Sequence, residues 1–367
     1  MTRERNAAAP PIVDATPKFH PAASETPQDW PALSSHLAAH GLRFDPEANP
    51  PRQFATGYGN LNYLIVVDGA TRVLRRPPMG KLPPGANDMR REHTILSAIA
   101  PVFPLAPRSL YHTMDDSVIG AQFMIMEYRP GLSIGGRLPP AVAAIPGIGR
   151  KLGGRLVDVL ATIHAIEPEA VGLGAFGKPE GFLARTAAGW RKRLMIATDD
   201  APTRAAVEVA DWLDANLVPE GPATLIHNDF KLDNVLLDPT TLEPVAVIDW
   251  DQGTRADPLF DLATMLSYWA EPSDPEAMLN LEQMPTAAHG FPRRREVVET
   301  YARLSGRDVS NILFHRVLAM LKLGVIFAQI HARYRRGESA DERYARFGPI
   351  VDGLFAFAHD ISRGRAF

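Results

Sequence analysis

The stretch Leu225–Asp251 reads LIHNDFKLDNVLLDPTTLEPVAVIDWD. Two short β-prone runs, 235–237 and 245–248, flank a turn-rich segment containing Asp238-Pro239, and this pattern predicts a β-hairpin. Acidic and amide side chains gather at both ends of the hairpin. Because a buried carboxylate without a partner costs several kcal/mol, this concentration predicts that a cation is supplied from elsewhere.

Composition and charge limit the classes of protein to which this chain can belong. With 367 residues, 46% of them hydrophobic, the chain is long enough for two domains and a sizeable core. Lysine and arginine (39) nearly balance aspartate and glutamate (42), which gives no electrostatic case for a nucleic-acid partner. The sequence contains no cysteine, so disulfides, thiolate metal sites and cysteine nucleophiles are excluded.

Neither a secretory signal nor a membrane span is expected. Residues 1–30 hold no apolar signal-peptide core. The most apolar long run, Leu313–Ala328, is interrupted by His315, Arg316 and Lys322, which indicates a buried helix. The expectation is therefore a cytoplasmic protein with no membrane partner.

Strand signals dominate the first third of the chain. Residues 1–27 are rich in Ala, Pro and Thr and predict a disordered N-terminal tail. A glycine-containing turn with Gly57 and Gly59 then leads into a β-branched run, and a second strand-like run follows across Asp68-Gly69, a strong hairpin signal. A hairpin beside a Gly-x-Gly loop can lay backbone N–H groups over a phosphate.

Helical periodicity dominates after residue 128. Helices are predicted at 30–40, 87–100, 148–166, 204–217, 257–269, 293–304, 308–336 and 340–358, and a buried strand at 122–128. The sequence therefore predicts an α+β fold with two lobes. We expect an N-lobe at 28–128, a C-lobe at 129–367, and a ligand-binding cleft between them.

Phosphoryl transfer needs few protein groups, and the N-terminal part offers two of them. Gly57 and Gly59 can form a loop that cradles phosphates, although such a pair is often only a turn. Arg75 can supply the cation that contacts phosphate oxygens, and Glu92 on the following predicted helix can hold that cation in place.

The predicted hairpin region offers the remaining groups. Asp229 can orient and deprotonate an attacking hydroxyl, while Asn234 and Asp249 can bind the metal ion. Taken singly, Asp229 is more often a loop-capping carboxylate, and the other two are ordinary turn residues. Their joint occurrence in the required order favours the catalytic interpretation.

These motifs resemble those of one known family. His227–Asn234 (HNDFKLDN) followed by Ile248–Asp251 (IDWD) resembles the catalytic motif of the aminoglycoside phosphotransferase and choline-kinase-like family. Further matches, which extend the resemblance over 52–335, are VLRRPPMGK at 73–81, REHTIL at 91–96, FMIMEY at 123–128, LATIH at 160–164 and DPLFDL at 257–262. The Arg-Arg-Pro-Pro form, with VGLGAFG at 171–177, looks most like the branch fused to, or encoded near, acyl-CoA dehydrogenases.

The resemblance implies a protein-kinase-like fold, with a small antiparallel sheet in a nucleotide-binding N-lobe and a large helical C-lobe that is catalytic and binds the acceptor. It also implies that the protein uses ATP or GTP together with Mg²⁺. Asp229 matches the catalytic base, and Asn234 and Asp249 match the magnesium ligands. Asp261 matches a carboxylate that braces the catalytic loop. The residues implied to bind the nucleotide are Gly57, Gly59, Asn60, Arg75, Glu92, Glu127 and Tyr128, the last two through backbone groups that face adenine.

Two positions depart from the family pattern. Arg75 stands where most relatives carry lysine, and arginine clamps phosphate in a bidentate manner but is bulkier. Asn228 replaces the usual glycine before the catalytic aspartate. It also stands where protein kinases carry an arginine that reads an activation loop, and the segment between Asp249 and Asp257 is too short to dock a peptide.

The expected acceptor is therefore a hydroxyl of a small molecule. The dehydrogenase-associated branch favours a hydroxylated acyl or hydroxy-acid compound. The alternatives are an aminoglycoside or a choline-like amino-alcohol, or a non-catalytic nucleotide-binding pseudokinase. The acidic residues of 271–282 and the arginines of 293–295 are expected to be solvated surface.

Overall fold

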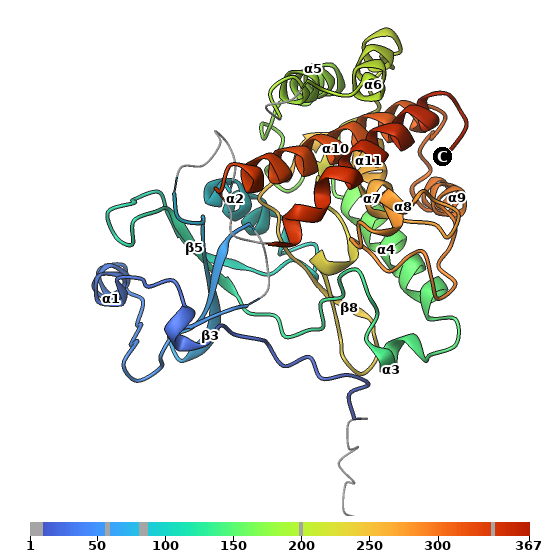
Figure 1. Cartoon of the computed structure of the whole chain (residues 1–367). Coiled ribbons are helices and arrows are strands. Elements are labelled where there is room, and N and C mark those ends of the chain that lie inside the picture. The colour runs from blue at the N-terminus through green and yellow to red at the C-terminus, as the bar shows by residue number, and fades with distance from the viewer. Residues whose placement is uncertain (1–9, 56–58, 81–86, 198–200, 339–341) are drawn as a thin grey trace, which may run out of the picture. The chain divides into compact units, whose positions relative to one another are not determined.

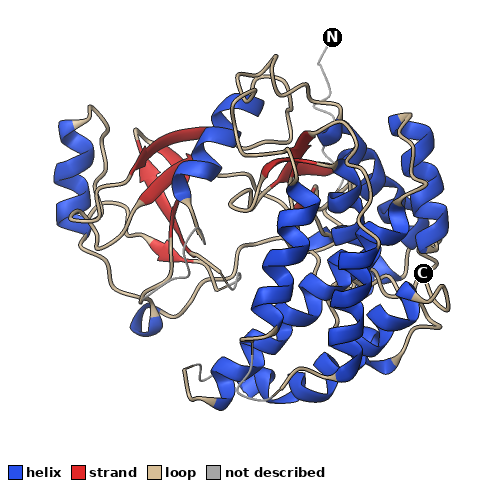
Figure 2. Ribbon diagram, turned by 90° about the horizontal axis from the view of Figure 1, so that it is seen from above, coloured by secondary structure: helices blue, strands red, loops and turns tan. Residues whose placement is uncertain are grey.

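The computed structural model describes residues 10–55, 59–80, 87–197, 201–338 and 342–367 (Figure 1). The chain divides into two compact units. The first comprises residues 1–133 and 234–253, and the second comprises 134–233 and 254–367. Strands dominate the first unit and helices the second, as Figure 2 shows by colour, and the predicted α+β class is confirmed.

An antiparallel sheet of five strands, in the order β1-β2-β3-β5-β4, forms the centre of the first unit. Its strands are β1 (Arg52–Gln53), β2 (Leu61–Val67), β3 (Ala70–Arg76), β4 (Ser109–Thr113) and β5 (Phe123–Glu127). The turn between β2 and β3 has Asp68 and Gly69 at φ 51° and 73°. Positive φ at both central residues is the tight hairpin geometry that this dipeptide favours, and the predicted hairpin is confirmed.

Two helices pack beside this sheet. Leu33 and Leu37 of α1 (Trp30–Ala39) are fully buried in a core shared with Tyr63 of β2 and with β5. The α2 helix (Met89–Ile99) packs on β4 and β5. It begins at Met89, within the predicted range 87–100, because the carboxylate of Asp88 caps it by accepting a hydrogen bond from Arg91 N at 3.2 Å.

The hairpin predicted at the outset is formed by β7 (Val235–Leu237) and β8 (Pro244–Val247). Its contacts group it with the first unit, although by sequence order it falls in the expected C-lobe, 129–367. Val247 N donates to Leu105 O at 2.8 Å, and Leu132 forms a bridge to Leu237. The hairpin is thus hydrogen-bonded to segments of the first unit that are remote in sequence.

Residues 10–27, for which the composition predicts a disordered tail, make backbone contacts in the first unit. Phe19 forms a β-bridge to Phe54, and the two ring centroids lie 5.1 Å apart. His20 N donates to Gln53 O at 2.9 Å. The segment pairs with β1 because an edge strand has backbone groups available for hydrogen bonding. Composition does not reveal this effect.

The second unit is built mainly of helices. Its longer helices are α4 (Ile148–His164), α5 (Phe182–Leu194), α6 (Arg204–Ala215), α7 (Pro258–Tyr268), α9 (Arg294–Ser305), α10 (Ile312–Arg335) and α11 (Phe347–Ser362). The shorter elements are α3 (Pro140–Ala143), α8 (Glu276–Leu279), β6 (Thr224–Ile226) and β9 (Thr254–Ala256), with the 3-10 turns η2 (Leu232–Asn234) and η3 (Glu342–Arg346). Helices α10 and α11 run side by side, and α7 packs on α10 (Figure 1).

Helix α10 is long and apolar enough to cross a membrane by length and composition alone. Its most apolar window is 83% buried inside the structure, against α7, α11 and α6. This agrees with the buried helix that the sequence predicts for 313–328. Its first turn begins at Ile312, later than the predicted start at 308.

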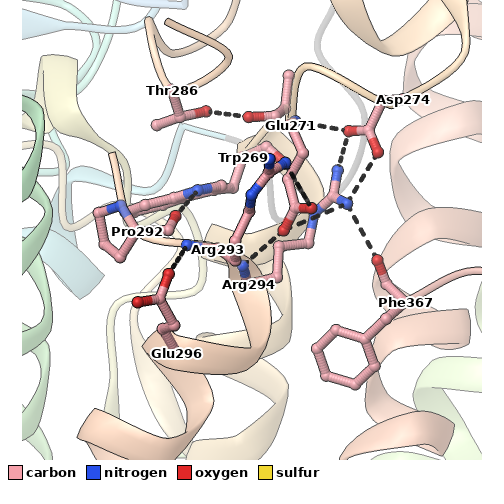
Figure 3. A network of polar contacts seen from close by, with 10 residues as sticks. Trp269, Glu271, Asp274, Thr286, Pro292, Arg293, Arg294, Glu296 and Phe367 are labelled. Carbon is pink, nitrogen blue, oxygen red and sulfur yellow. Dashed lines mark hydrogen bonds and ion pairs between the residues drawn. The ribbon is translucent and has the colours of Figure 1, made fainter. Parts of the chain in front are cut away.

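The expectation of a solvated surface at 271–282 and 293–295 is wrong for Arg294, Glu271 and Asp274 (Figure 3). The side chain of Arg294 is 2% exposed and that of Asp274 is 6% exposed, and the two form an ion pair. Arg294 Nε donates to Trp269 O at 2.8 Å, and Glu271 accepts from Arg294 N at 2.6 Å. Because both acidic partners come from another segment, the sequence-local pattern gives no sign of this burial.

Two adjacent glycines of α4 provide a matched test of packing. A Cβ at Gly153 would lie 2.6 Å from Pro292 Cδ and 3.2 Å from Trp269, whereas one at Gly154 would meet nothing within 4 Å. Gly153→Ala is expected to destabilise the protein by about 1–3 kcal/mol through overpacking. Gly154→Ala should stabilise it by about 0.5–1 kcal/mol through helix propensity. Urea denaturation of both variants checks this, and equal effects would contradict the packing at α4.

Candidate active site

The first unit contains a buried ion cluster around Arg75 of β3. Arg75 Nε lies 2.7 Å from Glu92 Oε2 of α2, and its Nη2 pairs with Asp249 and lies 3.6 Å from Asp251 Oδ2. The side chains of Arg75 and Glu92 are 6% and 0% exposed. The predicted pairing of Arg75 with Glu92 is therefore present, and Arg75 is the cation that the carboxylates after the hairpin require.

Three carboxylates surround one guanidinium in this cluster, so negative charge is in excess. Burial raises the pKa of Glu92, with Asp249 and Asp251 adding to the rise and the Arg75 charge opposing it. Burial alone would lower the pKa of Arg75, but its carboxylate partners outweigh that effect and keep it charged. An excess of oxygen-bearing negative charge is the environment that a hard divalent cation prefers.

The β7–β8 ladder brings the two expected metal ligands to the same end of the hairpin. Val235 pairs with Val247, and immediately beyond that pair Ile248 N donates to Asn234 O at 2.9 Å. Asn234 and Asp249 therefore flank the last rung of the ladder. Asp249 has a φ of 69°, a left-handed conformation that is unusual for a non-glycine residue and is often found at functional sites.

These donors fit a magnesium ion. Mg²⁺ in phosphoryl-transfer sites takes one or two protein ligands and completes its shell with phosphate and water oxygens. Asn234 offers an amide oxygen, and Asp249 a carboxylate with a side chain that is 36% exposed. Within the described parts of the chain no group of three His, Cys, Asp or Glu side chains could hold a metal, so a site made wholly of such protein ligands is not found there.

Amide side chains link Gly59 and Asn60, at the end of the predicted glycine loop, to the ion cluster by hydrogen bonds. Asn60 Nδ2 donates to Asp251 Oδ2 at 3.1 Å. Asn87 Nδ2 donates to Gly59 O at 2.7 Å and to Asn60 Oδ1 at 2.9 Å. Gly57 lies outside the described residues. Sequence reasoning missed Asn87, although an asparagine just before a helix cap was a visible signal.

Glu127 and Tyr128 lie at the end of β5. Glu127 N donates to Arg108 O at 2.8 Å, and the Glu127 carboxylate lies 3.1 Å from Arg129 Nη2. The Tyr128 ring stacks on Phe54 with 6.3 Å between centroids. The amide of Glu127 is therefore already used in the sheet.

In the second unit, Asp261 of α7 organises the loop that carries Asp229. It is fully buried, and its two carboxylate oxygens accept hydrogen bonds from His227 N and Asn228 N, both at 2.7 Å. His164 Nε2 lies 3.2 Å from the same carboxylate. Burial favours the protonated acid, but the hydrogen bond and charge of His164, with the His227 contacts, outweigh it and lower the pKa of Asp261. A charged Asp261 thus braces the loop, as the resemblance implied.

Asp229 itself contacts groups from α7 and from its own loop. Tyr268 donates its hydroxyl proton to Asp229 Oδ1 at 2.6 Å, and Lys231 Nζ lies 3.8 Å from Oδ2. Burial, together with the Asp229 charge, raises the pKa of Tyr268, so the phenol stays a hydrogen-bond donor. Sequence reasoning missed Tyr268. The signal was available, because Asp261 and Tyr268 lie two turns apart on one face of an apolar helix.

The predicted site residues thus fall into two groups. The first unit holds Asn60, Arg75, Glu92, Asn234 and Asp249, and the second holds Asp229. Each group is organised by buried charges within its own unit.

The two units have the fold of protein-kinase-like phosphotransferases. A Ralstonia eutropha protein provisionally assigned as an aminoglycoside phosphotransferase has a TM-score of 0.74, at 24% identity, covering 92% of this chain and 99% of that one. An aminoglycoside phosphotransferase solved with AMP-PNP and hygromycin B has a TM-score of 0.52, at 18% identity, covering 83% and 94%. The model of the phosphotransferase enzyme family, APH, matches residues 51–297, and the chain belongs to that family.

Curated relatives are named for a different enzyme. Acyl-CoA dehydrogenase family member 11 of Gallus gallus is 29% identical over 326 residues, which cover 86% of this chain and 41% of that protein. Family member 10 of Mus musculus is 28% identical over 318 residues, covering 86% and 29%. The chain thus spans well under half the length of these relatives. The predicted family and its dehydrogenase-associated branch are confirmed.

Proposed function

We propose that this protein transfers the γ-phosphate of ATP, or GTP, to a hydroxyl group of a small molecule. The observation that carries the proposal is the buried cluster of Arg75, Glu92 and Asp249 in the first unit. A strand cation held by a helix glutamate beside a metal-binding aspartate is the arrangement that kinase-type phosphoryl transfer needs. Membership of the phosphotransferase family supports the same chemistry.

Asp229 is proposed to orient the acceptor hydroxyl and accept its proton. The Tyr268 hydroxyl donates to Oδ1 and so helps to fix the carboxylate plane for acceptance of that proton. Asp261 accepts hydrogen bonds from the N–H groups of the two preceding residues, which fixes the position of the base.

The first unit is proposed to bind the nucleotide. Arg75 would contact phosphate oxygens, and Glu92 would keep its guanidinium oriented. Asn234 and Asp249 would hold Mg²⁺, which neutralises charge on the phosphates when bound. The loop residues Gly57, Gly59 and Asn60 would cover the phosphates, and Glu127 and Tyr128 would lie at the adenine.

The acceptor is proposed to be a hydroxylated acyl or hydroxy-acid compound. The names of the curated relatives, which join this region to an acyl-CoA dehydrogenase, support that choice. The competing acceptors are aminoglycosides, since hygromycin B is present in one structure of similar fold, and choline-like amino-alcohols, since a choline/ethanolamine kinase family protein has a similar fold.

A turnover panel tests the proposal directly. The protein is incubated with Mg²⁺ and ATP or GTP plus hydroxy acids, hydroxyacyl-CoA esters, choline-like alcohols or aminoglycosides, and the phosphorylated product is identified by mass spectrometry. We expect product only with the hydroxylated acyl or hydroxy-acid class. The matched control is the same acid without its hydroxyl, which should give no product. Nucleotide binding without turnover on any acceptor would contradict the proposal and favour a pseudokinase.

A further inference from the structure

Lys322 is a buried ammonium in the middle of the apolar helix α10. Its side chain is 4% exposed and is flanked in sequence by Leu321 and Leu323, which are fully or almost fully buried. Lys322 Nζ donates to Asn228 O at 2.6 Å and to Asn228 Oδ1 at 2.9 Å. It also lies 5.5 Å from the centre of the Phe260 ring. The ammonium therefore contacts one residue twice, and that residue precedes Asp229.

Asn228 is held from both sides of its backbone. Its N–H donates to Asp261 at 2.7 Å, and its carbonyl accepts from Lys322. Its φ is 66°, in the left-handed region, which asparagine tolerates better than most residues but less well than glycine. The side-chain hydrogen bond to Lys322 helps to offset that difference. Lys322 and Asn228 therefore form a pair in which one side chain supports the backbone conformation of the other.

We propose that Lys322 is a positioning residue for phosphate transfer: its ammonium fixes the peptide that joins Asn228 to Asp229, while Asp261 holds the N–H groups of the two residues before Asp229. The proposal rests on the proposed function, in which Asp229 is the base. The carbonyl held by Lys322 belongs to that same peptide, so a change in this contact turns the Asp229 backbone directly. Hydrogen bonds from a charged donor are about twice as strong as neutral ones, so deprotonation loosens this contact.

The charge of Lys322 changes close to physiological pH. Burial lowers its pKa from 10.5 to about 8, Lys231 acts in the same direction, and Asp229 and Asp261 oppose the shift. Those two carboxylates also bind Tyr268 and His164 of the neighbouring helices α7 and α4. The rate of transfer is therefore expected to fall as the pH rises through about 8.

Stability does not explain why a lysine stands here. Since its folded-state pKa lies below the unfolded value, the unfolded chain binds more protons between pH 8 and 10.5. Its contribution to stability therefore rises with pH through that window, and at neutral pH the buried ammonium is a net cost. An apolar side chain avoids this cost, which makes a role in the reaction the better account.

Three variants test the proposal: Lys322→Met, which removes the charge, Lys322→Arg, which keeps it at alkaline pH, and Asn228→Gly, which keeps only the backbone contact. The steady-state rate with the acceptor identified in the panel is measured from pH 6 to 10. Lys322→Met should lower kcat on the order of 100-fold, the cost of a misplaced reacting group, and leave the KM for the nucleotide nearly unchanged. Lys322→Arg should recover part of kcat and lose the decline near pH 8.

The Asn228→Gly variant separates the two contacts. Glycine adopts the left-handed backbone without a penalty and keeps the carbonyl bond to Lys322, so its kcat should fall less than that of Lys322→Met. An NMR titration of the Lys322 side chain should give a lower pKa in Asn228→Gly than in the unchanged protein, because one acceptor is lost.

The outcomes distinguish this proposal from the proposed function. If the unchanged protein transfers phosphate and Lys322→Met does so equally fast, the positioning role is overturned and the proposed function stands. The positioning role is also overturned, and the proposed function stands, if the transfer rate still declines near pH 8 in both Lys322 variants. If the unchanged protein transfers no phosphate to any acceptor, the proposed function is overturned and the positioning role with it.

Discussion

Asp229→Asn is expected to lower kcat for phosphate transfer by about 10²- to 10⁴-fold, the range that a positioned general base contributes. The substitution keeps the shape of the side chain and its contact with the Tyr268 hydroxyl, but the amide cannot accept the proton of the acceptor. The affinity for nucleotide should change little, because Asp229 is not among the proposed phosphate and metal ligands. Steady-state kinetics give kcat, and calorimetric titration with nucleotide on the same preparation gives the affinity.

Asp233→Asn is the matched control for this experiment. Asp233 lies on the same loop, 3.4 Å from Lys231, and its side chain is 33% exposed. It has the same charge as Asp229 but is not the proposed base, so its variant should show no comparable loss. Similar losses in both variants would mean that negative charge on the loop matters more than a specific base. An Asp229→Asn variant with more than about a tenth of the original kcat would remove Asp229 from that role.

Local sequence signals predicted the elements whose causes are local. The Asp68-Gly69 turn, the helix α2 and the β7–β8 hairpin each depend on residues that are close together in the chain. The pair of Arg75 with Glu92 was predictable for a different reason, since the family resemblance supplied the partner. None of these required knowledge of how distant segments pack.

The residues that were missed take their environment from distant segments. Arg294 looks like part of an exposed arginine run, yet Asp274 and Trp269 O enclose it. In the sequence, Tyr268 and Lys322 belong to apolar helical segments. Only the packing of α7 and α10 brings them to the loop that carries Asp229. Polar residues within apolar helices of this kind are better treated as candidates for buried contacts than as interruptions.

Buried charges of opposite sign hold the loop that carries Asp229. Asp261 is a charged acceptor for two N–H groups, and Lys322 is a charged donor for the next carbonyl. A backbone held by opposite charges on its two sides has little freedom to rotate, so Asp229 is preorganised without being buried itself. Because Asp229 is already in place, less free energy is needed to reorganise the site during the reaction.

Arg75→Met is expected to destabilise the first unit strongly. It leaves Glu92, which is fully buried, together with Asp249 and Asp251, without their shared cation. Breaking a buried ion pair by removing one partner costs about 3–5 kcal/mol, more than methionine regains through apolar burial. The effect is read from urea denaturation in the absence of nucleotide and Mg²⁺.

Two further variants isolate the cause of that loss. Arg72→Met on the same strand removes a half-buried arginine whose Nη1 donates to the neighbouring Thr71 O, and it should change stability by no more than about 0.5 kcal/mol. The double variant Arg75→Met/Glu92→Met removes the stranded carboxylate as well. It should be more stable than Arg75→Met alone, because the uncompensated buried charge is gone. If the double variant were instead less stable than Arg75→Met, the loss would come from packing around Arg75, and the ion pair would not be what stabilises this cluster.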